Sequence, residues 1–189
     1  MHLRASAMTE PNETNLLWMD MEMTGLDPER DTVLEIATVV TDSELVVVAQ
    51  GPTFAIHHPP EVLERMDAWN REHHGASGLV ARVLASTVSI AQAEQQTLAF
   101  TQQYCRERTS PLCGNSIWQD RRFLARYMPR LDRYLHYRTI DVSTVKELVR
   151  RWYPNGPQPP EKKHAHLAVD DIAESIAELR FYRAHYFRS

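Results

Sequence analysis

The sequence predicts a single α/β domain built on a mixed β-sheet. Three apolar, β-branched segments open the chain one after another. Shorter strand-like segments then alternate with helical ones in the second half, which favours a sheet that also has parallel pairs. The chain has 189 residues, a length that suits one domain with a sizeable core.

The three opening strands are predicted at residues 16–25, 32–42 and 45–57. Asp42 and Ser43 form the turn between the second and the third strand. This order of strands indicates an antiparallel meander.

Helices are expected next. Residues 59–86 read as short helical pieces, broken by Gly-Ala-Ser-Gly at residues 75–78. Ser89 caps a long helix over residues 90–109, in which apolar side chains recur on one approximate face.

The middle of the chain alternates between strands and helices. A short buried strand is predicted at residues 111–115 and a further strand at residues 137–142. Between them, residues 119–135 form a helix that is interrupted at Pro129.

The last part is predicted to be helix, loop and helix. Residues 143–153 form a helix with Ser143 or Thr144 as its cap. Residues 154–166 hold four prolines and a glycine and must form a loop. Residues 167–187 form a closing amphipathic helix. Its apolar stripe is Ile172, Ile176 and Leu179.

Composition indicates a cytoplasmic protein. Residues 1–14 have no apolar core of a secretory signal and read as a flexible lead-in. The chain has no run of about 18 apolar residues, so neither a spanning helix nor a membrane partner is expected. Cys105 and Cys113 fit buried thiols in a reducing compartment better than a disulfide framework.

The net charge of −4 limits the kind of partner. Proteins that hold long nucleic acids neutralise many phosphates with Lys and Arg. A negative chain argues against that mode of binding. It still permits a very short nucleic acid, and it permits divalent cations that offset clustered acids.

Two acids lie in the first strand, two positions apart. Residues at this spacing point to the same face of a strand, so Asp20 and Glu22 project together and the neighbouring methionines point away. Two adjacent carboxylates repel each other and resist burial. A hard cation such as Mg²⁺ or Mn²⁺ between them would explain the pair. Solvation at an edge strand is the alternative.

Further acids lie at helix starts. Asp120 follows a short strand, and Asp170 and Asp171 open the last helix, where acids also complement the helix dipole. His166, at the end of the Pro-rich loop, has the chemistry of a general base. His164 and His166 would alternatively suggest a zinc site, but the cysteines are not spaced to complete one.

Four segments carry a resemblance to a known family. "WMDMEMTGLDPERDTVLEIA", "GNSIWQDRRFLARYMP", "YRTIDVSTVKELVRRW" and "HLAVDDIAESIAELRFYR" resemble the DEDDh 3′→5′ exonucleases of the ribonuclease H-like superfamily. The four acids in order, with a His five residues before the last, form a specific signature. "GNSI-x-QDR" and "HYR-x-x-DVST" are most similar to the oligoribonucleases. The resemblance implies a five-stranded ribonuclease H-like sheet flanked by helices, in one exonuclease domain over residues 15–189.

The resemblance also implies the catalytic residues. It gives metal ligands at Asp20, Glu22, Asp120 and Asp171, and a general base at His166. Two divalent cations, Mg²⁺ or Mn²⁺, would then support phosphodiester hydrolysis.

The same resemblance implies contacts to the substrate. Leu26 would wedge against a base, and Trp69 would stack on one. The alternative is that Trp69 is an ordinary aromatic residue of the core. His74 and Ser116 match contacts to base or sugar. Trp118 stands where several members of the family have glycine, and it would lie near the site or cover the helix start.

A cap for the substrate's 5′-phosphate is also implied. It would consist of Tyr137, Arg138, Ser143 and Thr144. In the family the Tyr and the Arg reach across from the partner subunit, so the resemblance implies a homodimer. Such a cap would act as a ruler for very short chains, above all 5′-phosphorylated dinucleotides.

The sequence therefore predicts a metal-dependent 3′→5′ exoribonuclease that converts short oligoribonucleotides to nucleoside 5′-monophosphates. A broader DEDDh exonuclease acting on longer RNA or DNA ends is the alternative. A non-catalytic nucleic-acid-binding domain is disfavoured, because buried carboxylates without metals would only destabilise the fold.

Overall fold

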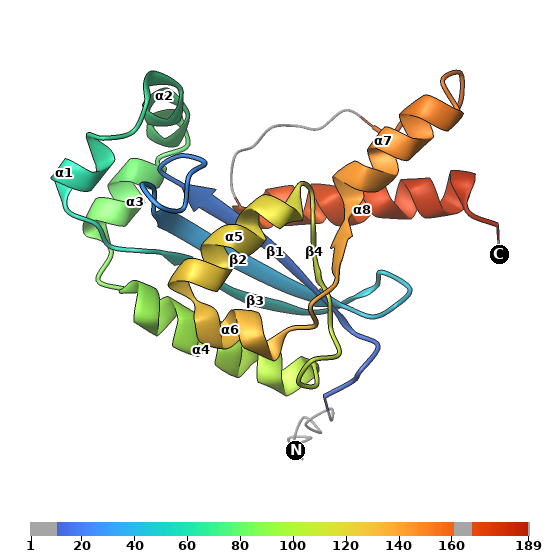
Figure 1. Ribbon diagram of the computed structural model, residues 1–189, viewed down its shortest axis with the longest axis horizontal. Coiled ribbons are helices and arrows are strands. Elements are labelled where there is room, and N and C mark those ends of the chain that lie inside the picture. Colours follow the sequence, from blue (N-terminus) through green and yellow to red (C-terminus); the bar gives the residue numbers. More distant parts are fainter. Residues whose placement is uncertain (1–10, 161–167, 189) are drawn as a thin grey trace, which may run out of the picture.

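A five-stranded sheet forms the centre of the molecule (Figure 1). The computed structural model describes residues 11–160 and 168–188. The strands lie in the order β3-β2-β1-β4-β5. Their bounds are β1 Leu16–Met23, β2 Val33–Thr41, β3 Val47–Ala55, β4 Leu112–Gly114 and β5 Thr139–Asp141. The first three pair antiparallel, and β4 and β5 continue the sheet in parallel, which confirms the predicted mixed sheet.

Helices cover both faces of this sheet (Figure 1). Three short helices, α1 Pro60–Leu63, α2 Ala68–Ala76 and α3 Leu79–Ala85, follow β3. The others are α4 Ile90–Tyr104, α5 Ile117–Tyr127, α6 Pro129–Tyr134, α7 Val142–Trp152 and α8 Ala168–Tyr186. Helices α4, α5 and α6 share one core cluster with the sheet, and α7 and α8 share the other.

The alternation of β1 decides which side chains meet which helices. Leu17, Met19 and Met21 belong to the core cluster with α4, α5 and α6, whereas Trp18 belongs to the cluster with α8. Successive side chains of a strand point to opposite faces. The even-numbered acids of β1 therefore lie on the side of the sheet that α8 covers.

The breaks between helices are where the sequence predicts them. Helix α5 ends at Tyr127 and α6 begins at Pro129, because a proline fits the first turn of a helix but not its interior. Gly78 separates α2 from α3 with a φ of 72°, a left-handed conformation that glycine adopts without strain.

Helix α4 begins as predicted but ends early. Ser89 and Gln92 form a capping box at its start. The prediction that the helix continues to residue 109 is wrong, because Cys105 is extended and forms an isolated bridge with Asn12. Asn12 N–H donates to the carbonyl of Tyr104 at 3.0 Å, so this residue of the expected lead-in, residues 1–14, lies against the end of α4.

The predicted cap of α7 is also wrong. The helix begins at Val142, and Asp141 caps it by accepting the Ser143 backbone N–H at 2.9 Å. Neither Ser143 nor Thr144 takes that position, because β5 ends at Asp141 and its carboxylate is a good N-cap acceptor.

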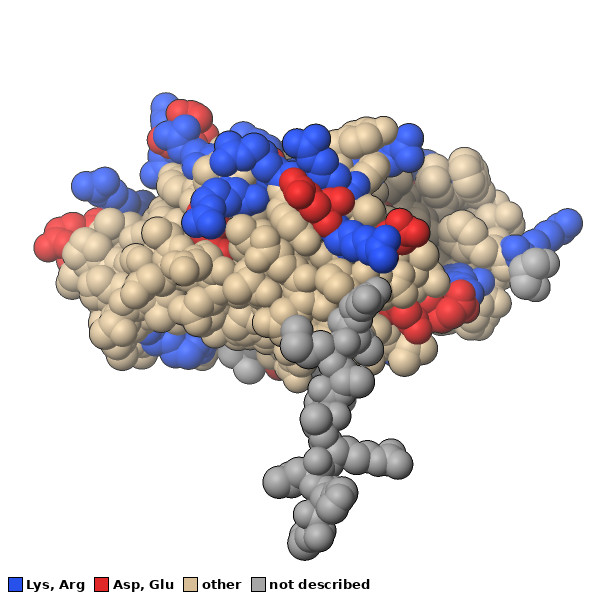
Figure 2. Space-filling model, turned by 90° about the horizontal axis from the view of Figure 1, so that it is seen from below, with Lys and Arg blue, Asp and Glu red and all other residues tan. Residues whose placement is uncertain are grey.

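Surface charge is unevenly distributed. Figure 2 shows Lys and Arg gathered mainly along one edge of the face in view, while most of that face is neither acidic nor basic. Cys105 and Cys113 are buried free thiols, as expected. Among the described residues, no helix has the length and apolar character needed to cross a membrane.

Candidate active site

Three carboxylates meet where β1 passes the start of α8. Asp20, Glu22 and Asp171 each offer one carboxylate oxygen, and these oxygens all lie within 4.8 Å of one another. Asp20 and Glu22 share one face of β1, as their spacing predicts, and α8 brings Asp171 to that face. Asp170, the neighbouring acid of α8, is exposed, in keeping with a helix-start role.

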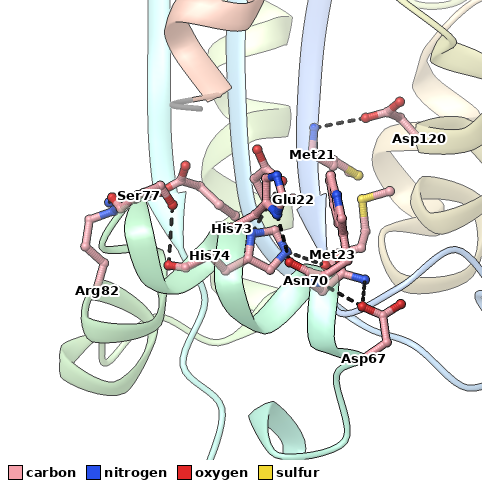
Figure 3. Close-up of polar contacts among 12 residues, drawn as sticks. Met21, Glu22, Met23, Asp67, Asn70, His73, His74, Ser77, Arg82 and Asp120 are labelled. Atoms are coloured by element: carbon pink, nitrogen blue, oxygen red, sulfur yellow. Dashed lines mark hydrogen bonds and ion pairs between the residues drawn. The ribbon is translucent and has the colours of Figure 1, made fainter. Parts of the chain in front are cut away.

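Asp120 lies beside this cluster and not within it. It is 7 % exposed, and its Oδ1 accepts the backbone N–H of Met21 at 2.9 Å (Figure 3). The described pairing of β1 with β4 ends at Trp18, so Asp120 serves as the acceptor for an amide further along β1. Because Met21 stands between Asp20 and Glu22, this bond brings the fourth predicted acid next to the other three.

Burial makes the charged state of these acids unfavourable. It raises the pKa of Glu22 to about 7, with further contributions from the charges of Asp171, Glu35 and Asp120. The pKa of Asp120 is raised to about 7 by burial, although the hydrogen bond from Met21 opposes the shift. Burial, followed by the neighbouring acids, raises the pKa of Asp20 well above its ordinary value. Added positive charge would favour the ionised form of all of these groups.

The donor set fits a hard divalent cation. All candidate ligand atoms are carboxylate oxygens, which Mg²⁺ and Mn²⁺ prefer. The described residues bring no cysteine or histidine ligand into the three-carboxylate cluster, so the zinc alternative gains no support from it.

Glu35 is an acid of the site that the sequence analysis missed. It lies opposite Glu22 in the β1–β2 register and is only 3 % exposed. Arg82 of α3 neutralises it, with Nη2 donating to Glu35 Oε1 at 2.9 Å and Nε at 3.2 Å. A lone Glu inside the apolar run of β2 was the available signal, but its partner depends on the packing of α3.

His74 supports Glu22 and the end of β1. Its Nε2 donates to the Met23 carbonyl at 2.9 Å, and its Nδ1 lies 3.9 Å from Glu22 Oε2 (Figure 3). Burial lowers the pKa of His74, which favours the neutral ring. The expected contact of His74 with base or sugar stays a prediction.

Two exposed apolar side chains come from segments near the acids. Leu26, in the loop after β1, is 71 % exposed, and Trp69 of α2 is 62 % exposed. Trp69 stacks on the His73 ring at a centroid distance of 3.8 Å. The alternative reading of Trp69 as a core aromatic is therefore wrong, and its role as a stacking platform stays a prediction.

The predicted phosphate-cap residues divide into two groups. Ser143 meets Ser116, the predicted contact to base or sugar, and their hydroxyl oxygens lie 3.2 Å apart. Tyr137 and Arg138 precede β5, where the Arg138 guanidinium lies 5.2 Å from the centroid of the exposed Tyr137 ring. Thr144 is exposed in the first turn of α7. His166, the predicted general base, lies outside the described residues, as does His164.

Comparisons with known proteins decide the family. A family model described as "Exonuclease" matches residues 17–179. The chain is 60 % identical over 177 residues to the oligoribonuclease of Pseudomonas paraeruginosa, covering 94 % of this chain and 98 % of that protein. The chain belongs to the exonuclease family, among the oligoribonucleases. This exonuclease is also 59 % identical to the oligoribonuclease of Halorhodospira halophila, covering 94 % of this chain and 97 % of that protein.

Solved structures show the same fold. Exonuclease I of E. coli, in complex with a dT13 oligonucleotide, matches with a TM-score of 0.73 at 16 % identity, over 91 % of this chain and 41 % of that one. Exonuclease I of Methylocaldum szegediense matches with a TM-score of 0.70 at 20 % identity, over 91 % and 41 %. This exonuclease spans about two-fifths of those chains. The likeness confirms the expected ribonuclease H-like fold, and family membership makes the protein a phosphodiester hydrolase of the metal-dependent exonuclease class.

Proposed function

We propose that this exonuclease removes nucleotides from the 3′ end of very short RNA and releases nucleoside 5′-monophosphates. The observation that carries the proposal is the convergence of Asp20, Glu22 and Asp171, within 4.8 Å, in a chain about 60 % identical to proteins named oligoribonuclease. A phosphodiester resists hydrolysis until the charge that develops on its oxygens is stabilised. Clustered carboxylates serve that purpose by holding cations.

The proposed cofactor is a pair of divalent cations, Mg²⁺ or Mn²⁺. Asp20, Glu22 and Asp171 would hold them, with Asp120 as the fourth ligand. Burial and the charges of neighbouring acids raise the pKa of Glu22 to about 7, and this supports the assignment because a bound cation would favour the charged form. When bound, such cations activate the attacking water and stabilise the leaving oxygen.

His166 is the proposed general base. A histidine with a near-neutral pKa takes a proton from water efficiently at physiological pH. The support for this role is the sequence spacing, with His166 five residues before Asp171. His74 of α2 contacts the Glu22 carboxylate and donates to the Met23 carbonyl, and so holds the end of β1 in place.

Stacking is the proposed means of holding the bases. Leu26 would wedge against one base and Trp69 would stack on one, while His74 and Ser116 would contact base or sugar. The high exposure of Leu26 and Trp69 supports this, because neither side chain contributes its full area to the core.

A cap on the 5′-phosphate is proposed to set substrate length. Ser143 would offer a hydroxyl donor, with Thr144 beside it, and the Ser143 hydroxyl lies 3.2 Å from that of Ser116. Tyr137 and Arg138 of the partner subunit in a homodimer would complete the cap. The support is that both side chains are exposed and lie together ahead of β5. Dinucleotides with a 5′-phosphate would then fit best.

Surface charge supports a short substrate over a long one. The net charge is −4, and the basic residues in Figure 2 gather mainly along one edge. A protein that tracks long RNA or DNA relies on many phosphate contacts. A dinucleotide needs only stacking and a few anchored hydrogen bonds.

A length series tests the proposal. We expect kcat/KM for 5′-phosphorylated RNA to fall about tenfold or more as length increases from two to about ten nucleotides, since only the dinucleotide fills the cap. Each length is measured with Mn²⁺ or Mg²⁺ and again with EDTA. A flat or rising profile would favour the broader exonuclease instead.

A further inference from the structure

The loop that carries Leu26 has a folded conformation of its own. It joins β1 to β2, and the Asp31 carboxylate closes it by accepting the Thr24 hydroxyl and the Asp27 backbone N–H, each at 3.0 Å. A Cβ atom at Gly25 would come within 2.5 Å of that carboxylate, so a larger residue there would displace the Asp31 side chain that closes the loop. The loop therefore presents Leu26 from an ordered backbone, although the leucine side chain is 71 % exposed.

Helix α5 holds the backbone of Leu26 directly. Gln119 Nε2 donates to the Leu26 carbonyl at 2.6 Å, and Arg122 Nη1 approaches the same oxygen at 3.4 Å. Arg122 Nη1 also donates to Gln119 Oε1 at 2.9 Å, which fixes the amide so that its nitrogen faces the loop. The Arg122 guanidinium lies 5.9 Å from the centroid of the Trp118 ring, within the range of a cation–π contact.

The base of the loop has a separate anchor. Tyr127 OH donates to the Asp31 carbonyl at 2.5 Å and to the Pro28 carbonyl at 3.2 Å. Arg126 pairs with Glu29 at 2.6 Å. These contacts, with the Asp31 turn, account for the folding of the loop. Asp31 accepts the N–H of the Leu26–Asp27 peptide, whereas the carbonyl of that same peptide is bound by α5.

We infer that Gln119 and Arg122 are positioning residues, which fix Leu26 so that its side chain meets the substrate's base. The inference rests on the proposed function, in which Leu26 acts as the wedge. Fixing an exposed leucine gives the fold little, because its side chain buries little area. A fixed Leu26 favours substrate binding instead, because less conformational entropy is lost when the base binds.

A double-mutant cycle on Leu26 and Gln119 tests the inference. The substrates are a 5′-phosphorylated dinucleotide and two analogues of it, each lacking one base. We expect Leu26→Ala to lower kcat/KM for the intact dinucleotide and to spare one analogue. Gln119→Ala should lower it about tenfold and spare the same analogue. The double variant should be no slower than Leu26→Ala alone, because both changes remove one interaction.

Two further variants exclude trivial explanations. Gln119→Glu keeps the size of the side chain but loses the amide donor, so it should behave like Gln119→Ala. Gln103→Ala removes an exposed glutamine of α4 and should match the wild type on all three substrates. Thermal melts and hydrogen exchange across residues 24–32 show whether each variant keeps the fold while the loop becomes more mobile.

The outcomes separate this inference from the proposed function. If Leu26→Ala leaves the intact dinucleotide unaffected, the wedge itself is refuted, and the inference with it. If Leu26→Ala is slow but Gln119→Ala is not, only the inference is overturned. Additive losses in the double variant, equal losses on all three substrates, or a fully active Gln119→Glu would overturn it as well.

Discussion

Glu22 and Glu35 face each other across two buried strands, an arrangement that ordinarily destabilises a sheet. The Glu35 side chain is 4 % exposed and forms an ion pair with Arg82, in which Nη2 lies 2.9 Å from Oε1. Arg82 thus neutralises the acid that lies farther from the cluster, which leaves Glu22 available to bind a cation. The contribution of Arg82 is structural and electrostatic, not catalytic.

Removal of Arg82 should therefore destabilise the protein. We expect Arg82→Ala to lower the free energy of unfolding by about 2 kcal/mol, because Glu35 is left buried without its partner. The measurement is urea unfolding of the metal-free protein. The double variant Glu35→Gln/Arg82→Ala should recover much of the loss, since no unpaired charge remains. A double variant as unstable as Arg82→Ala would show that packing of the arginine, and not its charge, is what matters.

At the scale of elements, the junction between β5 and α7 positions residues of the proposed phosphate cap. Asp141 ends β5 and caps α7, and its carboxylate also accepts the Ser116 backbone N–H at 2.9 Å. One carboxylate thereby fixes the two segments that bring Ser116 and Ser143 together. The preceding segment, with Tyr137 and Arg138, is exposed, as the proposed contact with a partner subunit requires.

Arg138 is expected to recognise phosphate and little else. Arg138→Ala should lower kcat/KM for a 5′-phosphorylated dinucleotide by about a hundredfold, since a charge-assisted contact to the phosphate is lost. The same dinucleotide with a 5′-hydroxyl should be cleaved at the wild-type rate. Steady-state kinetics on both substrates give the comparison, and an equal loss on the two would refute the cap.

Features that depend only on the spacing of residues close in the chain could be predicted from the sequence. Alternation along β1 is enough to place Asp20 and Glu22 on one face, and helix-start signals are enough to place Asp171 and the Ser89 cap. The pairing of Glu35 with Arg82 could not be foreseen, because it depends on strand register and on the packing of a distant helix.

The same limit applies to Asp120 and Asp141. The sequence places Asp120 at a helix start and Asp141 within a predicted strand. It does not show that Asp120 accepts a β1 amide or that Asp141 caps α7 and bonds a second segment. Such bonds form only when elements far apart in the chain pack together.

At the scale of the whole molecule, the acids link stability to pH. Glu22 and Asp120 have folded-state pKa values of about 7, above their ordinary values of 4.5 and 3.8. A group with a raised pKa stabilises the fold below its unfolded pKa, and that contribution is lost as pH rises through the folded value. The metal-free protein should therefore lose stability, by several kcal/mol, between about pH 4.5 and pH 8.

Urea unfolding at a series of pH values, with EDTA present, measures this loss. Glu22→Gln should flatten the profile, because the substituted side chain does not titrate. Mn²⁺ should restore stability most strongly at the alkaline end, where the carboxylates are free of protons. Stability that rises steadily over this pH range in the metal-free protein would contradict the raised pKa values.

The central claim is that the carboxylates of β1 and α8 hold the cations on which hydrolysis depends. Its most direct test follows cleavage of a 5′-phosphorylated dinucleotide by three samples: wild type stripped with EDTA, the same protein after Mn²⁺ is restored, and Asp20→Asn with Mn²⁺. We predict cleavage only in the second sample, with the others at least about a thousandfold slower. Thermal melts would verify that Asp20→Asn keeps the fold. Cleavage that persists in the stripped protein, or full activity of Asp20→Asn, would contradict the account.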